Sequence, residues 1–213
     1  MVELNSYEYI SNQKPKMLII LLHGYGANGA DLFGLKHYLI SSLGADIAIS
    51  APDAPQVCEM GMGSDYRQWF SLAERNPQLL KQQAAGADPI LKNYIKQQLK
   101  KYNLTADKLV IAGFSQGCMM ALYSGLGLAD APAAIIGWSG MFIEGGNIRN
   151  QAPVQLWHGD MDEVVPLVCL NDAKEKLAPF GIDAETHIVK GVGHTIAPEA
   201  LEGSMQFIRD HIG

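Results

Sequence analysis

The sequence has few cysteines, few charged residues and no long apolar run. Its three cysteines, Cys58, Cys118 and Cys169, are odd in number and lack paired spacing. That pattern excludes a disulfide framework and a zinc site built from cysteine pairs, and it favours a reducing compartment. Charged residues make up only 18% of the chain, the formal net charge is -6 and no Lys/Arg-rich run occurs, so the basic footprint of a nucleic-acid-binding protein is missing.

No stretch has the character of a membrane span or a linker. The first apolar run, residues 17–22, is too short for the core of a signal peptide or for a bilayer, so we expect a cytoplasmic protein without stable membrane insertion. Internal repeats and low-complexity tracts are also missing, while 48% of the residues are apolar, which is enough for one continuous core. The sequence therefore predicts a single domain over residues 1–213.

Apolar, β-branched runs alternate with segments of helical periodicity. Strands are expected at residues 17–22, 47–50, 108–112, 133–138, 154–158 and 185–189, and an edge strand at residues 7–11. Helices are expected at residues 31–43, 89–102, 116–126, 167–180 and 198–212. These runs are continuous rather than alternating in their apolar character, and such strands are usually buried on both faces. This order predicts an α/β fold, with a mostly parallel sheet between helices and a site beyond the carboxyl ends of the strands.

A glycine-flanked serine lies where a strand should turn into a helix. Residues 113–117 read Gly-Phe-Ser-Gln-Gly, directly after the expected strand 108–112. This setting is typical of a nucleophile elbow, because glycines permit the tight turn and the following helix aims free N–H groups at the reacting centre. We therefore predict that Ser115 is a nucleophile. The alternative is a glycine turn that merely joins strand to helix.

A serine hydroxyl is a weak nucleophile, so it needs a histidine base that a carboxylate holds in the right tautomer. His194 follows the expected strand 185–189 in a Gly-Val-Gly-His sequence, whose glycines let a loop carry the imidazole back over the sheet. His194 is therefore the candidate general base. His23 and His158 each precede a glycine at a strand end, a place that suits a buried group supporting a loop.

Three carboxylates follow the expected strand 154–158, so an acid precedes the histidine as this type of fold requires. Asp162 is favoured as the acid of the triad. Asp160 lies close to the strand end, where an aspartate commonly braces a turn by accepting backbone N–H bonds. Glu163 suits a solvent-facing position.

A second motif, residues 24–29, reads Gly-Tyr-Gly-Ala-Asn-Gly and matches the G-x-G-x-x-G pattern of a dinucleotide site. Asp53 would be the ribose-binding acid of such a site. A Rossmann-type dinucleotide-binding protein is thus the non-hydrolase alternative, but it leaves the candidate serine, acid and histidine without a role. A hydrolase uses this loop as well, to supply an oxyanion N–H from Tyr25 beside that of Gln116.

With these residues in place, the chain resembles the phospholipase/carboxylesterase family, which includes acyl-protein thioesterases and small bacterial carboxylesterases. Residues 22–29 look like its oxyanion loop, 113–117 like its elbow, 158–166 like its acid loop and 191–194 like its histidine loop. The resemblance runs over nearly the full length and implies an α/β-hydrolase fold without a large lid domain. It also implies that Asp162 is the triad acid and that Tyr25 and Gln116 donate the oxyanion hydrogen bonds.

The chain departs from the family pattern at two positions. Tyr25 stands where many members carry leucine, which matters little because the oxyanion donor is a backbone group. Cys118 stands where a further glycine is frequent. It either crowds the start of the helix or packs there as a small apolar residue.

Residues 51–72 resemble the family's substrate-side loop. Its candidate substrate-binding residues are Trp69, Met62 and Phe70, since methionine and aromatic side chains suit an adaptable apolar groove. The alternative is that the aromatic side chains close the core beneath the loop. Because no insertion is long enough for a lid, we expect an open and shallow pocket.

The sequence thus predicts a serine hydrolase that cleaves carboxylic esters or thioesters of short to medium acyl chains through an acyl-enzyme. No metal or organic cofactor is required, and the expected partner is a small-molecule ester or an acylated substrate. An acyl-protein thioesterase and a lysophospholipase are alternatives within the family, and a catalytically silent scaffold is another. The apolar segment 141–143 is either a pocket wall or the interface of a homodimer.

Overall fold

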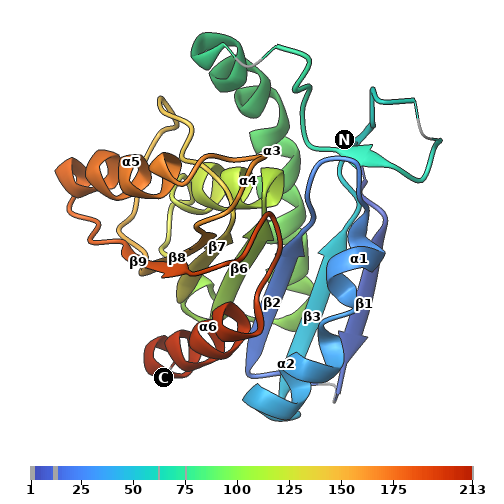
Figure 1. The fold of residues 1–213 in the computed structure, drawn as a ribbon. Helices are drawn as coiled ribbons and strands as arrows, with labels where there is room; N and C mark the ends of the chain where they lie inside the picture. The colour runs from blue at the N-terminus through green and yellow to red at the C-terminus, as the bar shows by residue number, and fades with distance from the viewer. Residues whose placement is uncertain (1–2, 12–13, 62, 75, 213) are drawn as a thin grey trace.

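A seven-stranded sheet forms the centre of the molecule (Figure 1). The structure is a computed structural model that describes residues 3–11, 14–61, 63–74 and 76–212. Within these ranges the strands of the sheet are β1 Ser6–Ile10, β2 Met17–Leu22, β3 Ile47–Pro52, β6 Leu109–Phe114, β7 Ala134–Trp138, β8 Val154–Gly159 and β9 Glu185–Val189. They lie in the order β1-β3-β2-β6-β7-β8-β9. Only β1 is antiparallel to its neighbour, so the parallel strands end at one edge.

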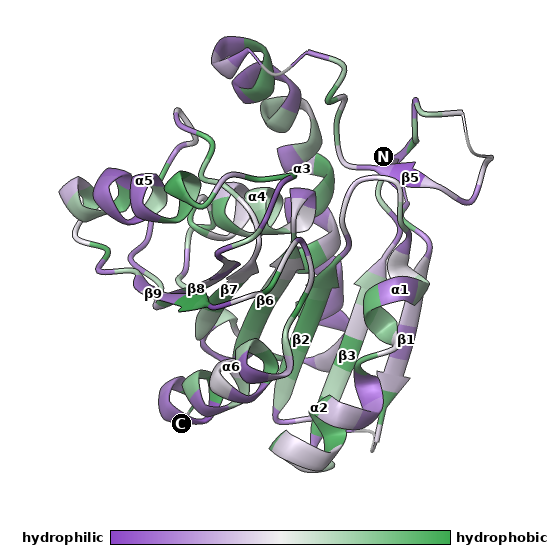
Figure 2. Ribbon diagram, in the orientation of Figure 1, coloured by the Kyte–Doolittle hydropathy of each residue, from purple (hydrophilic) through white to green (hydrophobic). Residues whose placement is uncertain are grey.

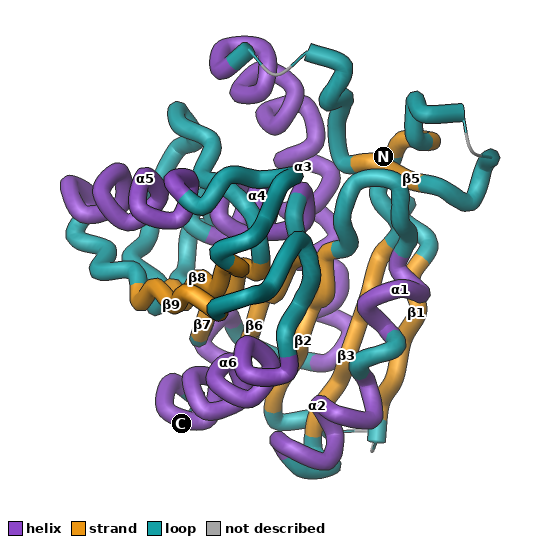
Figure 3. Tube along the Cα trace, in the orientation of Figure 1, coloured by secondary structure: helices purple, strands orange, loops and turns teal. Residues whose placement is uncertain are grey.

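Helices cover both faces of the sheet (Figure 3). Their bounds are α1 Gly29–Phe33, α2 Lys36–Leu43, α3 Pro77–Tyr102, α4 Gln116–Gly125, α5 Val168–Leu177 and α6 Pro198–His211. Two 3-10 turns lie at Ala106–Lys108 and Ala178–Phe180. A small hairpin of β4 Gln56–Val57 and β5 Arg67–Gln68 stands apart from the sheet.

The central strands of the sheet are coloured as hydrophobic in Figure 2, and the side chains of β2 alternate between two layers of the core. Leu18 and Ile20 pack on one face with residues of α3, α4 and α5, whereas Ile19 and Leu21 pack on the other face with residues of α1, α2 and α6. All four side chains are fully buried. Burying a side chain of this size contributes roughly 1.5–3 kcal/mol, so the central strands anchor both layers. The predicted fold class, a mostly parallel sheet between helices, is confirmed.

Most predicted elements are present with ends shifted by one or two residues, and the expected edge strand is β1. The helix predicted at 31–43 is instead two helices, α1 and α2. Gly34 closes α1, because its N–H donates to the carbonyls of Ala30 and Asp31. Such tightened bonds end a helix.

The helix predicted to begin at Pro89 begins earlier, at Pro77. The side chain of Asn76 caps it by accepting from the Gln78 N–H, and Pro77 occupies its first turn, where a missing N–H costs nothing. Pro89 therefore lies inside α3, and the carboxylate of Asp88 pairs with Lys92 at 2.8 Å. The helix tolerates this proline because its buried stripe continues on both sides of it.

Candidate active site

Ser115 occupies a strained turn between β6 and α4. Its backbone has φ 53° and ψ -114°, and its N–H donates to the carbonyl of Trp138 on β7 at 2.8 Å. A non-glycine residue rarely adopts such a conformation unless the surrounding structure imposes it, and such strain clusters at functional sites. The predicted strand-turn-helix setting of Ser115 is therefore present.

Two glycines make this turn sterically feasible. A Cβ on Gly113 would lie 2.2 Å from the carbonyl oxygen of Gly117, and a Cβ on Gly117 would lie 1.9 Å from the carbonyl oxygen of Leu22. Both neighbours are backbone atoms, so they cannot move aside as a side chain would. The glycines let α4 begin directly against the ends of β2 and β6.

Asp162 and His194 form a hydrogen-bonded pair on neighbouring loops. Oδ2 of Asp162 lies 2.7 Å from Nδ1 of His194, and Nδ1 is the donor because a carboxylate only accepts. Oδ1 of Asp162 accepts from the N–H groups of Val164 and Val165, both at 2.9 Å. Burial alone would raise the pKa of Asp162, but the hydrogen bonds from His194 and from the backbone outweigh it, so the pKa is lowered.

With Nδ1 occupied, Nε2 is the nitrogen of His194 that can act as a base. His194 and Ser115 line the same cavity. The imidazole packs against the ring of Phe114, the residue before the serine, with 4.8 Å between ring centroids. The structure thus brings the predicted serine, histidine and acid to one place at the carboxyl edge of the sheet.

Asp160 and His158 support the acid loop. Asp160 accepts from the Gly191 N–H at 2.6 Å, which ties the acid loop to the histidine loop, as expected for an aspartate that braces a turn. His158 is buried, donates from Nε2 to the carbonyl of Val165 at 2.8 Å and lies 3.4 Å from Oδ2 of Asp162. Both side chains therefore hold the loop that carries Asp162.

His23 supports the oxyanion loop rather than taking part in chemistry. Its Nδ1 donates to the carbonyl of Gly24 at 2.7 Å, and its Nε2 accepts from the Ala54 N–H at 3.0 Å. Both ring nitrogens are therefore used in the neutral form. Burial lowers the pKa of His23, which keeps the ring neutral.

The predicted oxyanion donors flank Ser115. A Cβ on Gly24 would lie 3.5 Å from Cβ of Ser115, and Tyr25 lines the cavity beside the serine. Gln116 is the first residue of α4, so its N–H has no partner within the helix and is free for an anion. The loop after β2 and the start of α4 thus both lie beside Ser115, and the role of Tyr25 and Gln116 as oxyanion donors stays a prediction.

Trp69 and Phe70 lie in the core and do not line the cavity. Both are 0% exposed, and neither is among the residues that face Ser115. The side chain of Gln116 holds them in place, because it accepts from the Trp69 N–H and donates to the Phe70 carbonyl, both at 2.8 Å. The core-closing alternative is therefore what the structure shows for both, and the expected substrate contact is corrected. Met62 lies outside the described residues.

The cavity beside Ser115 has a volume of about 410 Å³ and a largely apolar lining. Its described lining residues are Gly24, Tyr25, Leu72, Leu80, Phe114, Ser115, Met119, Met141, Val164, Val165, Pro166, Cys169 and His194. Sequence patterns missed most of these because they come from segments far apart in the chain. One sequence signal did exist: Met141, from the apolar segment 141–143, is a pocket wall, and Phe142 and Ile143 are buried.

The dinucleotide alternative is not supported by the geometry of its motif. Asp53, the expected ribose-binding acid, accepts from the Gly29 N–H at 2.9 Å and so holds the start of α1. A Cβ on Gly29 would lie 2.2 Å from the carbonyl oxygen of Ala51. These residues of the motif therefore serve helix packing.

Within the described ranges, no His, Cys, Asp and Glu side chains gather in a group of three or more that could hold a metal ion. Nor does any helix in this part of the chain have both the length and the apolar character to cross a bilayer.

Glu59 joins three segments beside the cavity. Its carboxylate accepts from the hydroxyl of Tyr25 at 2.8 Å, from the hydroxyl of Ser71 at 2.6 Å and from the Leu72 N–H at 2.9 Å. Tyr25 and Leu72 line the cavity. Tyr25, where family members often carry leucine, thus adds a link between the oxyanion loop and the segment before α3.

We expect Glu59→Gln to raise KM for ester substrates about fivefold with a smaller change in kcat, because a net hydrogen bond is worth roughly 1 kcal/mol. The hydrogen bond from Ser71 lowers the pKa of Glu59 most, and that from Tyr25 adds to it. A carboxyl group whose pKa is lower in the folded protein than in the unfolded chain stabilises the folded state at pH values above its unfolded-state pKa. This contribution is lost as the pH falls through its folded-state pKa. The KM values of the unmodified enzyme and of Glu59→Gln should therefore converge at low pH. Glu74→Gln is the control and should leave KM unchanged. Equal KM values at neutral pH would contradict the link.

Comparison with known proteins gives consistent matches over nearly the whole chain. The sequence model of a family described as Phospholipase/Carboxylesterase matches residues 8–212. The chain is 26% identical to Acyl-protein thioesterase 1 homolog 1 of Dictyostelium discoideum, over 96% of this chain and 94% of that protein. It is 28% identical to Esterase YpfH of Escherichia coli (strain K12), over 95% of this chain and 84% of that protein.

A solved structure agrees with these relatives. The crystal structure of esterase PE8 has a TM-score of 0.91 and 36% sequence identity, and the match covers 99% of this chain and 100% of that one. The fold is therefore the predicted α/β-hydrolase fold, and the chain is an enzyme of the esterase and acyl thioesterase class. It belongs to the phospholipase/carboxylesterase family.

Proposed function

We propose that the enzyme hydrolyses carboxylic esters or thioesters of short to medium acyl chains, with Ser115 as nucleophile, His194 as general base and Asp162 as the residue that orients the base. The observation that carries this proposal is the 2.7 Å hydrogen bond from His194 to Asp162, next to a serine in a strained elbow that lines the same cavity. Such a constellation is recognised by geometry and roles rather than by sequence position.

The proposed reaction has two steps. Nε2 of His194 takes the proton of the Ser115 hydroxyl as Oγ attacks the substrate carbonyl, and the backbone N–H groups of Tyr25 and Gln116 stabilise the oxyanion. The imidazolium then gives its proton to the leaving alcohol or thiol, which leaves an acyl-enzyme on Ser115. In the second step His194 takes a proton from water, the resulting hydroxide attacks the acyl group, and the acid departs as the proton returns to Ser115.

The character of the cavity supports a small ester or an acylated molecule as substrate. Its lining is mostly apolar and its volume of about 410 Å³ lies within the usual range for small-molecule sites. The three cysteines are free, as suits a reducing compartment, so we propose a cytoplasmic enzyme. The mechanism uses only groups of the chain and water.

The test is to trap the acyl-enzyme. A nitrophenyl ester mixed rapidly with the enzyme should release a burst of nitrophenolate equal to the enzyme concentration, and acid quenching followed by mass spectrometry should place the acyl group on the peptide that contains Ser115. Cys169 also lines the cavity, so Cys169→Ser is the matched control and should give the same burst. An acyl group on Cys169, or ester binding without turnover as in a silent scaffold, would refute the proposal.

A further inference from the structure

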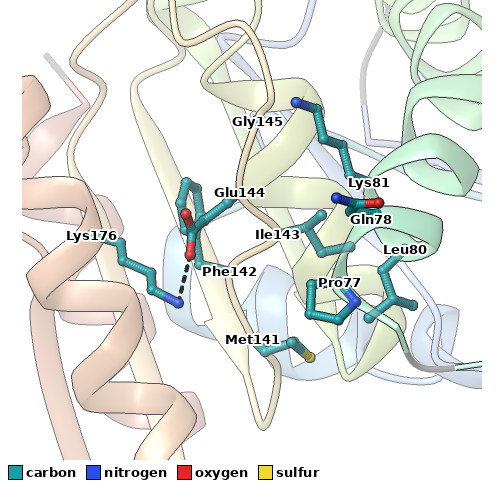
Figure 4. Close-up of a pocket in the computed structure, with 10 residues that line it drawn as sticks. All are labelled: Pro77, Gln78, Leu80, Lys81, Met141, Phe142, Ile143, Glu144, Gly145 and Lys176. Carbon is teal, nitrogen blue, oxygen red and sulfur yellow. Dashed lines mark ion pairs between the residues drawn. The ribbon is translucent and has the colours of Figure 1, made fainter.

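A second cavity adjoins the one beside Ser115 (Figure 4). It has a volume of about 420 Å³ and lies between the start of α3, the segment after β7 and the end of α5. Leu80 and Met141 line both cavities. A substrate held at Ser115 that reached past these two side chains would enter the second cavity.

The second cavity has an apolar lining and charged residues beside it. Its apolar lining residues are Pro77, Leu80, Met141, Phe142 and Ile143. The charged residues are Lys81, Lys176 and Glu144, which Figure 4 shows as sticks around the apolar group. An apolar chain that ends in a charged group matches this distribution.

The two lysines differ in their partners. Nζ of Lys176 lies 2.7 Å from a carboxylate oxygen of Glu144, so this pair is neutral as a whole. Among the described residues no carboxylate forms an ion pair with Lys81. Its side chain lies against Gly145, where a Cβ would be 2.4 Å from Nζ, and Gly145 has φ +87°, a conformation that favours glycine. The glycine thus leaves room for the ammonium group of Lys81 beside the cavity.

We propose that the second cavity binds an apolar arm of the substrate that ends in a carboxylate, and that Lys81 binds this carboxylate. The inference rests on the proposed function, because the arm belongs to an ester whose reacting carbonyl group is held at Ser115. Both the acyl group and the alcohol of an ester can carry such an arm. An unpaired cation beside an apolar cavity discriminates between substrates that differ only in the charge at their far end.

The experiment compares substrates of equal length that end in a carboxylate or in a methyl group. For the acyl side these are mono-nitrophenyl esters of dicarboxylic acids against nitrophenyl alkanoates. For the alcohol side they are acetyl esters of ω-hydroxy acids against alkyl acetates, followed by pH-stat titration. The measured quantity is the ratio of kcat/KM, carboxylate over methyl, in each series.

Lys81→Ala should lower this ratio about two- to fivefold in one series, which is within the range for an exposed ion pair. Glu144→Gln should raise it, because removing the neighbouring negative charge frees Lys176. High salt should reduce the ratio for the unmodified enzyme. Lys174→Ala, on the same helix as Lys176 but outside this cavity, is the control and should leave it unchanged.

The outcomes separate this inference from the proposed function. A ratio that Lys81→Ala leaves unchanged in both series, while Ser115 still hydrolyses the methyl-ended esters, overturns the anion site alone. Failure of the unmodified enzyme to hydrolyse any of these esters counts against the proposed function. Because Lys81 and Glu144 are exposed, neither substitution should impair folding.

Discussion

Ser115→Ala and His194→Ala should each lower kcat for a nitrophenyl ester about 10⁵- to 10⁶-fold, and Asp162→Asn about 10⁴-fold, in line with the losses that related triads show. The reason is that in the proposed mechanism the three groups act as one catalytic unit, in which Asp162 orients His194 and His194 activates Ser115. In the wild-type chain a carboxylate oxygen of Asp162 accepts from Nδ1 of His194 at 2.7 Å. In Asp162→Asn the amide NH₂ group can donate to Nδ1 instead, which favours the tautomer that carries its proton on Nε2 and cannot act as the base. The measurement is single-turnover and steady-state hydrolysis by purified variants.

Two comparisons sharpen this expectation. The double variant Ser115→Ala with His194→Ala should be no slower than either single variant, because members of a unit are not additive. Asp160→Asn is the matched control for the acid: it alters the other aspartate of the same loop, which braces Gly191, and should cost far less than Asp162→Asn. Turnover by Ser115→Ala within tenfold of the unmodified enzyme would exclude the serine mechanism.

The strain at Ser115 gives a stability readout that is independent of activity. Ser115 holds φ 53°, and such strain costs about 1–3 kcal/mol. Ser115→Gly relieves it and Ser115→Ala does not, although both variants lack the nucleophile. The glycine variant should therefore unfold at a higher urea concentration than the alanine variant, because the relieved strain exceeds the roughly 0.4–1 kcal/mol by which glycine favours the unfolded chain.

The elbow, the acid loop and the histidine loop could be predicted from the sequence because each is a local device. Gly113 is needed for a steric reason that arises within the motif, because its Cβ would lie 2.2 Å from the carbonyl oxygen of Gly117, and the strand before the elbow is apolar from Leu109 to Ala112. The reason for Gly117 is not local, because its Cβ would meet the carbonyl oxygen of Leu22 at the end of β2, but the glycine itself is part of the recognisable motif. The carboxyl ends of parallel strands lie together, so residues on separate loops could be expected to meet there.

The substrate side could not be predicted because its geometry depends on contacts between distant segments. Trp69 and Phe70 are equally compatible with a groove and with a core until the buried side chain of Gln116 is seen to bind their backbone. The start of α3 was predicted wrongly for a related reason. Pro89 suits the first turn of a helix, and only the packing of the residues before it shows that the helix has already begun at Pro77.

Gly117→Ala should destabilise the protein by more than about 4 kcal/mol, a loss seen only for severe steric or packing faults. The added Cβ would lie 1.9 Å from the carbonyl oxygen of Leu22 and 2.8 Å from that of His23. To avoid them α4 must move away from the end of β2, and Ser115 moves with it. Since total stability is commonly about 5–15 kcal/mol, thermal unfolding should shift by many degrees or the variant should fail to fold.

Gly86→Ala is the matched control because it makes the same chemical change within a helix. A Cβ at Gly86 meets nothing within 4 Å, so the change should stabilise by about 0.5–1 kcal/mol through helix propensity. The two substitutions thus have opposite expected signs, which separates the contact at the elbow from the intrinsic preference of alanine for helix. If Gly117→Ala unfolds at the same temperature as the unmodified protein, α4 does not approach β2 as closely as the structure places it, and the steric reason for the elbow glycine fails.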